Sequence, residues 1–165
     1  MKGFYYQTKL GSMFIAEDGQ GITEVTLLQG EVPNPDGLDS RVKNSDFEPE
    51  ETNLIREAAV QMMEYLDGTR KDFTVLLSPK GTSFQQKVWE ALRAIPYGET
   101  RSYKQIAEAV GNKNASRAIG MANHHNPIMC IIPCHRVIGA DGRLVGYAGG
   151  LDTKAELLKL EEKYR

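Results

Sequence analysis

The first thirty residues contain three short runs of β-branched and aromatic side chains, separated by polar turn residues. These runs, residues 2–9, 12–16 and 22–28, have the length and composition of β-strands. We expect them to form a small antiparallel sheet, because the glycines between them favour tight turns. Residues 30–50, which hold prolines and many charges, predict a loop or an irregular connection.

Beyond residue 50 the apolar residues recur at helical intervals of three and four. They predict helices over residues 52–68 and 82–95, with Trp89 in the core, and a final amphipathic helix that begins at residues 152–153. Residues 73–77 predict one further short strand between the first two helices.

A Ser-Pro-Lys-Gly break at residues 78–81 divides the chain into two predicted domains, 1–78 and 79–165. A chain of 165 residues is long enough for two small domains that each bury a core. The expected fold class is α+β: an N-terminal α/β domain with a small antiparallel sheet, then a mostly helical C-terminal domain.

The C-terminal domain contains the pattern of a helix-turn-helix motif. Residues 103–110 predict the first helix and residues 115–121 the second, with Ser102 and Asn114 as N-caps and Gly111 in the turn. In this motif the second helix docks in a nucleic-acid groove, whereas a plain helical hairpin has the same pattern.

Charge is distributed unevenly along the chain, whose net charge is −2. Residues 1–78 hold seven Lys and Arg against fourteen Asp and Glu, a net charge of −7, whereas residues 79–165 hold thirteen against eight, a net charge of +5. A basic half indicates a polyanionic partner, although charge asymmetry also arises by chance.

The composition argues against several classes of protein. No apolar run approaches the roughly 20 residues that span a bilayer, and the N-terminus lacks the apolar core of a signal peptide, so we expect no membrane contact and a cytoplasmic location. Two cysteines, Cys130 and Cys134, cannot build a disulfide scaffold, and a zinc site would need histidines as partners without the usual spacing. We therefore expect no metal, and the lack of a phosphate loop or dinucleotide fingerprint predicts no cofactor.

Residues 132–137, Ile-Pro-Cys-His-Arg-Val, place a thiol beside an imidazole and a guanidinium. A cysteine reacts as the thiolate, and because a free thiol has a pKa of about 8.5, a neighbouring base or cation is needed to activate it at neutral pH. Cys134 is therefore a candidate nucleophile, with a buried structural cysteine as the alternative.

The second half of the chain resembles the O6-alkylguanine-DNA alkyltransferases. The motifs that carry this resemblance are Gly-Thr-Ser-Phe-Gln at residues 81–85, Val-Trp-Glu-Ala-Leu at 88–92, Ile-Pro-Tyr-Gly-Glu-Thr at 95–100, Ile-Pro-Cys-His-Arg-Val-Ile at 132–138 and Gly-Gly-Leu at 149–151. The first half is similar only in layout. The resemblance implies a ribonuclease H-like N-terminal domain and a winged-helix-like C-terminal domain.

The resemblance also implies a DNA repair activity, that of a methylated-DNA–[protein]-cysteine S-methyltransferase. In this family a guanine alkylated on O6, and in some members a thymine alkylated on O4, is flipped out of the duplex, because a thiolate cannot reach the alkyl carbon inside the stack. The alkyl group then moves irreversibly to the cysteine, so each molecule acts once. The implied partner is alkylated double-stranded DNA, and we expect a monomer.

Carried over residue by residue, the resemblance makes Cys134 the acceptor. His135 would deprotonate it through a bound water, and Glu161 would hold His135 in the required tautomer. Asn126 would make the turn that holds the second helix of the motif against the cysteine loop. Tyr103 would contact DNA and protonate the leaving guanine.

The remaining expected site residues lie at the DNA and around the base. Arg117 would fill the gap that the flipped base leaves. The other expected DNA-binding residues are Ala115, Ser116 and Asn123, and the expected pocket residues are Val137, Tyr147 and Ala148. Two positions depart from the family. Position 148 is Ala where many members place serine, which removes a hydroxyl, and residues 123–125, Asn-His-His, are bulkier and more polar than the small residues of some members, which leaves the substrate size open.

Two other functions are compatible with parts of the sequence. Alkyltransferase-like proteins bind the lesion without transferring a group, but they lack the cysteine that this chain has at position 134. A regulatory DNA-binding module would use the helix-turn-helix, although the N-terminal half shows no second DNA-binding motif.

Overall fold

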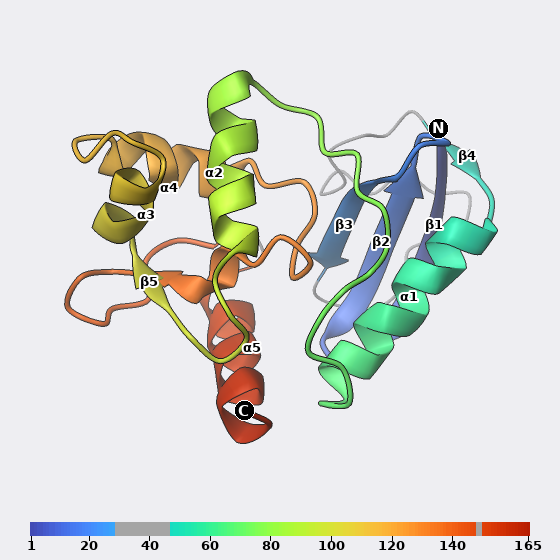
Figure 1. The fold of residues 1–165 in the computed structure, drawn as a ribbon. Helices are drawn as coiled ribbons and strands as arrows, with labels where there is room; N and C mark the ends of the chain where they lie inside the picture. The colour runs from blue at the N-terminus through green and yellow to red at the C-terminus, as the bar shows by residue number, and fades with distance from the viewer. Residues whose placement is uncertain (29–46, 148–149) are drawn as a thin grey trace. The chain divides into compact units, whose positions relative to one another are not determined.

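The computed structural model describes residues 1–28, 47–147 and 150–165, which form two compact units (Figure 1). The first unit comprises residues 1–80 and 127–129, and the second comprises residues 81–126 and 130–165. The expected α+β class is confirmed, with a sheet and one helix in the first unit and mostly helices in the second. No helix in these residues is both long and apolar enough to cross a membrane.

The first unit is built on a four-stranded sheet in the order β3-β2-β1-β4. The expected antiparallel meander is present as β1 (Lys2–Thr8), β2 (Gly11–Glu17) and β3 (Ile22–Leu28). The sheet is nevertheless mixed, because β4 (Glu48–Pro49) pairs parallel to β1. The sequence predicts a loop at the residues that form β4. The rest of that expected loop, residues 30–46, lies outside the described residues.

Helix α1 (Asn53–Leu66) lies along the sheet (Figure 1). It begins where the sequence predicts, since the Thr52 hydroxyl accepts a hydrogen bond from the Ile55 N–H at 3.2 Å. Its apolar stripe, which includes Ile55, Ala58 and Met62, is buried, and α1 contacts β1, β2 and β3.

The strand predicted over residues 73–77 is wrong in extent. Of these residues only Leu77 forms a β-bridge, and its partner is Ile22 of β3. In this bridge the Ile22 N–H donates to the Leu76 carbonyl at 2.8 Å. A segment distant in sequence, residues 127–129, pairs with β3 through Val25 instead: the Val25 N–H donates to the Pro127 carbonyl at 2.9 Å. Backbone groups at a buried strand require such partners, and the sequence does not show which segment supplies them.

The second unit carries the helices of the predicted helix-turn-helix. Its elements are α2 (Ser83–Arg93), β5 (Arg101–Ser102), α3 (Tyr103–Ala109), α4 (Ser116–His124), the 3-10 turn η1 (Cys134–Arg136), β6 (Val137–Ile138) and α5 (Leu151–Lys163). Capping boxes at Thr82–Gln85 and Ser102–Gln105 determine where α2 and α3 begin. The Trp89 side chain of α2 is 2% exposed and donates to the Ala122 carbonyl at 2.9 Å, so its core position is confirmed.

Three predicted helix boundaries in this unit are wrong. The N-cap of α4 is Ala115, not Asn114, because the Asn114 N–H turns back to the Asn112 side chain at 3.3 Å. Helix α4 also continues to His124, which the sequence suggests is a loop residue. Helix α5 begins at Leu151, one residue early, after Gly150 in the left-handed region at φ +93°.

Gly81 offers a test of packing in the second unit. A Cβ at this position would meet the buried Trp89 ring and lie 2.7 Å from the Gln85 Oε1 that forms the capping box. We expect Gly81→Ala to lower the free energy of unfolding by about 1–3 kcal/mol through overpacking, as measured by urea denaturation. Gly120→Ala is the matched control, because its Cβ would meet only Tyr103 at 3.9 Å and alanine favours the helix. Equal effects of the two changes would contradict the packing argument.

Candidate active site

The backbone of the cysteine loop is held by one carbonyl group, that of Ile132. Pro133, at φ −82° and ψ 64°, forms an inverse γ-turn in which the Cys134 N–H donates to this carbonyl at 2.8 Å. The buried Asn126 amide donates to the same carbonyl, also at 2.8 Å. Cys134 therefore enters η1 from a turn that is fixed on both sides.

A buried carboxylate, Glu161 of α5, gathers the residues that follow the thiol. His135 Nε2 lies 2.6 Å from Glu161 Oε2, and Arg136 binds both carboxylate oxygens, at 2.9 Å from Nε and 3.0 Å from Nη2. The Gly98 N–H donates to Glu161 at 3.0 Å, and Arg136 also donates to the Ile95 carbonyl at 2.7 Å. The cluster thus joins α5, η1 and the turn after α2.

The protonation states within this cluster follow from burial and charge. Burial alone would raise the pKa of Glu161, but hydrogen bonds from His135 and Arg136 hold it at about 2, so Glu161 is ionised. Burial lowers the pKa of His135, against the pull of Glu161, so the imidazole is neutral at pH 7. Since an ionised carboxylate accepts, Nε2 carries the proton and the lone pair lies on Nδ1. A neutral, oriented imidazole is the form that can accept a proton.

Lys154 of α5 is a buried cation that holds two loops. Its ammonium donates to the carbonyl of Val137 at 2.6 Å, and to those of Val145 and Gly146 at 3.2 and 3.3 Å. Burial lowers the pKa of Lys154, while the charge of Cys134 acts in the opposite direction. The ammonium of Lys154 and a thiolate at Cys134 would therefore stabilise each other.

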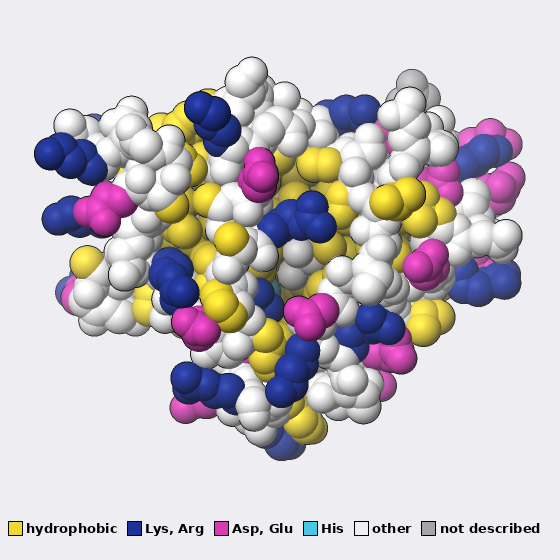
Figure 2. Space-filling model, viewed as in Figure 1, with side chains coloured by type: hydrophobic (Ala, Val, Ile, Leu, Met, Phe, Trp, Pro, Cys, Tyr) yellow, Lys and Arg dark blue, Asp and Glu magenta, His cyan; other side chains and the backbone are white. Residues whose placement is uncertain are grey.

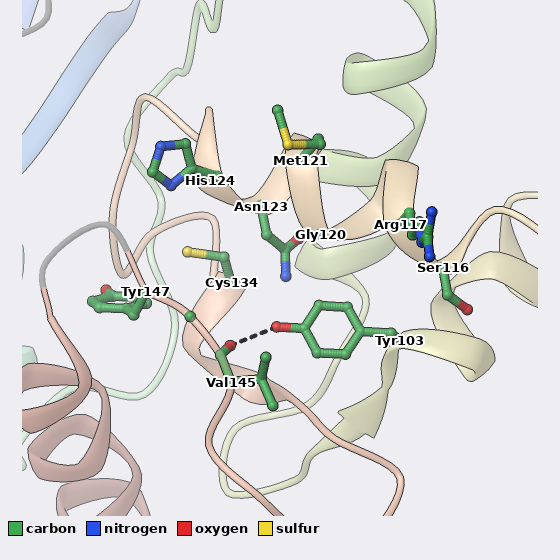
Figure 3. Close-up of a pocket in the computed structure, with 11 residues that line it drawn as sticks. Tyr103, Ser116, Arg117, Gly120, Met121, Asn123, His124, Cys134, Val145 and Tyr147 are labelled. Carbon is green, nitrogen blue, oxygen red and sulfur yellow. Dashed lines mark hydrogen bonds between the residues drawn. The ribbon is translucent and has the colours of Figure 1, made fainter.

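Cys134 borders a pocket of about 660 Å³. Figure 3 shows the Cys134 sulfur between His124 and Tyr147 in this view, with Tyr103 on the other side. The Tyr103 hydroxyl donates to the Val145 carbonyl at 2.8 Å. Burial, and secondly the charge of Cys134, raises the pKa of Tyr103, so its hydroxyl keeps its proton. A proton donor and a thiol therefore face the same cavity.

The structure gathers many, but not all, of the predicted site residues at this pocket. Those that line it are Tyr103, Ser116, Arg117, Asn123, Cys134 and Tyr147. Those outside its lining are Ala115, Asn126, His135, Val137 and Glu161, and Ala148 lies outside the described residues. Val137 is fully buried and is not among the residues that line this pocket.

Sequence reasoning missed several residues. The other pocket residues are Gly120, Met121, His124, Val145 and Gly146. The spacing of the α4 residues, one and two turns after Arg117, is the signal that could have identified Met121 and His124. For Arg136 the sequence suggests a cation beside the thiol, whereas its guanidinium binds Glu161.

The second cysteine is a core residue. Cys130 is buried, and burial raises the pKa of its thiol well above the usual range. It is the one non-glycine residue of the described chain at positive φ, +68°. In the described parts of the chain, no three His, Cys, Asp or Glu side chains gather as a metal site.

Comparisons with known proteins agree over nearly the whole chain. Two family models match: "6-O-methylguanine DNA methyltransferase, ribonuclease-like domain" over residues 1–79, and "6-O-methylguanine DNA methyltransferase, DNA binding domain" over residues 83–163. A methylated-DNA–protein-cysteine methyltransferase of Methanosarcina acetivorans is 49% identical over 94% of this chain and 95% of its own length. The constitutive one of Bacillus subtilis is 47% identical over 94% and 92%. The crystal structure of Mycobacterium tuberculosis OGT in complex with DNA has a TM-score of 0.87 and 40% identity, covering 99% of this chain and 94% of that one.

The buried carboxylate predicts a large stability effect. Glu161→Gln leaves the Arg136 guanidinium buried without its counter-charge, so we expect the free energy of unfolding to fall by about 3–5 kcal/mol in urea denaturation. Glu162→Gln, which changes the exposed neighbour, should stay within about 0.5 kcal/mol of the unaltered protein. Similar losses in the two variants would show that the cluster does not stabilise the fold.

The protonation of His135 predicts a pH dependence. Because folding lowers the pKa of His135, the unfolded chain binds more protons below its ordinary pKa of about 6.5, and stability falls as the pH decreases. We expect the free energy of unfolding to decrease less steeply between pH 7 and pH 5 in His135→Gln. Identical slopes in the two proteins would contradict a neutral, buried His135.

Proposed function

Because this chain belongs to the 6-O-methylguanine DNA methyltransferase family, we propose that it repairs alkylated DNA by moving the alkyl group from O6 of guanine to its own Cys134. The observation that carries this proposal is the thiol itself: it borders a cavity large enough for a flipped base, next to a neutral, oriented His135. O4-alkylthymine would enter the same cavity.

In the proposed reaction the thiol proton leaves first. His135 takes it, through a water, and the imidazolium that forms is stabilised by Glu161 at 2.6 Å. The Cys134 thiolate then attacks the alkyl carbon, the carbon–O6 bond breaks as the carbon–sulfur bond forms, and the Tyr103 hydroxyl protonates the leaving guanine. The proton held by His135 replaces the one that Tyr103 gives up, through solvent, so the net change exchanges the thiol proton for the alkyl group. Thiol and lesion are the only reactants, so the step as written needs no cofactor.

Binding would involve the helix-turn-helix of the second unit. We assign Arg117 to the gap left by the flipped base, and Ala115, Ser116 and Asn123 to further contacts from α4 with the DNA. Tyr147 would flank the base, and Asn126 would keep α4 and the cysteine loop in register.

The charge of the second unit supports a DNA partner. On the face of this unit that Figure 2 shows, Lys and Arg side chains are scattered rather than gathered in one patch, and residues 79–165 have a net charge of +5. Such a surface supports salt-dependent contact with phosphates, largely independent of base sequence. We further propose that the protein acts as a monomer in the cytoplasm.

A mass measurement tests the reaction. After incubation with a duplex that holds one O6-methylguanine, we expect the protein to gain one methyl group, assigned to Cys134 rather than Cys130 by fragmentation of the peptide that holds both. Cys134→Ala should bind the same duplex and gain nothing. Unaltered protein that binds the lesion but keeps its mass would instead be a lesion-binding module.

A further inference from the structure

Met121 is a large apolar residue on the rim of the pocket, and it is 57% exposed. It lies on α4, whose opposite face is buried through Ile119 and Ala122. The rotation of α4 is therefore fixed by its core face, and the Met121 side chain is held outward (Figure 3).

Met121 follows Arg117 by four residues on the same helix. Side chains at this spacing are neighbours on one helix face, with their Cβ atoms about 5–6 Å apart. Gly120 lies between them and adds no side chain, so that a ligand could approach the backbone closely there. Any duplex that receives Arg117 in its base stack would also meet Met121.

The opposite rim of the pocket is apolar too. Val145 is 48% exposed, and its carbonyl is held by Tyr103 at 2.8 Å and by Lys154 at 3.2 Å. An apolar side chain cannot hydrogen-bond a phosphate, whereas the faces of bases are apolar and can pack against it. The polar and charged side chains of the lining, Ser116, Arg117 and His124, can contact phosphate, whereas its apolar part, Met121 and Val145, fits base faces better.

We propose that Met121 is a second wedge, which enters the base stack beside the gap filled by Arg117 and keeps the neighbouring pair unstacked while the lesion lies in the pocket. This inference rests on the proposed function. Unstacking a base step costs a few kcal/mol, which an inserted apolar side chain offsets in part. Methionine suits this position because its unbranched, polarisable side chain adapts to irregular gaps.

The first test compares duplex and single-stranded substrates. A wedge is needed only where a stack must be opened, so Met121→Ala should lower the ratio of the methyl-transfer rate constants, duplex over single strand, by about tenfold, which corresponds to about 1.4 kcal/mol. Met121→Leu should restore most of the ratio. Val60→Ala, which truncates another exposed apolar residue at 51% exposure on α1, is the matched control and should leave the ratio unchanged. A ratio in Met121→Ala equal to that of the unaltered protein would overturn the proposal.

The second test measures binding alone and requires no methyl transfer. With 2-aminopurine in the pair next to the lesion, Cys134→Ala should raise the fluorescence on binding, because the probe is unstacked, and the added Met121→Ala change should make this rise smaller at saturating protein. An equal rise in both proteins would overturn the wedge. If the unaltered protein transfers no methyl group, the proposed function fails, while this fluorescence comparison still decides the role of Met121.

Discussion

The second unit depends on one buried negative charge, the carboxylate of Glu161. An isolated ion in the protein interior is costly, so the site is stable only because a guanidinium, an imidazole and a backbone N–H surround this carboxylate. These partners come from η1 and from the turn after α2, whereas Glu161 itself comes from α5. The requirement to satisfy one charge therefore brings three segments together and holds the loop of the thiol in place.

The nucleophile is positioned by side chains that bind backbone carbonyls. Asn126 binds the carbonyl before Pro133, Lys154 binds that of Val137, and Tyr103 binds that of Val145. Loops lack the repeating hydrogen bonds of helices and strands, so such contacts give them a single conformation. A single loop conformation matters for the proposed reaction, because attack at carbon requires the thiolate, the alkyl carbon and the leaving oxygen to lie in line.

The parts of the fold that depend on neighbours in sequence were predictable. Ser102 caps α3 as expected, since a cap needs only residues three positions away. The pairing of residues 127–129 with β3 was not predictable, because it joins distant segments. Arg136 and Lys154 were missed as structural residues for a related reason: a cation in sequence usually indicates solvent, and only the fold shows the carboxylate or carbonyls that pair with it.

A single use of the thiol would follow from this architecture. Transfer of an alkyl group converts Cys134 into a thioether, which is a far weaker nucleophile than the thiolate, and removing the alkyl group again would require the thiolate to act as a leaving group, which it does poorly. His135, oriented by Glu161, and Lys154, bound to three carbonyls, are a base and a cation rather than nucleophiles placed to attack the alkyl carbon. They are arranged to form and stabilise a thiolate, and a thioether offers no proton to take and no charge to stabilise. The same contacts that would make the first transfer fast therefore provide no path back.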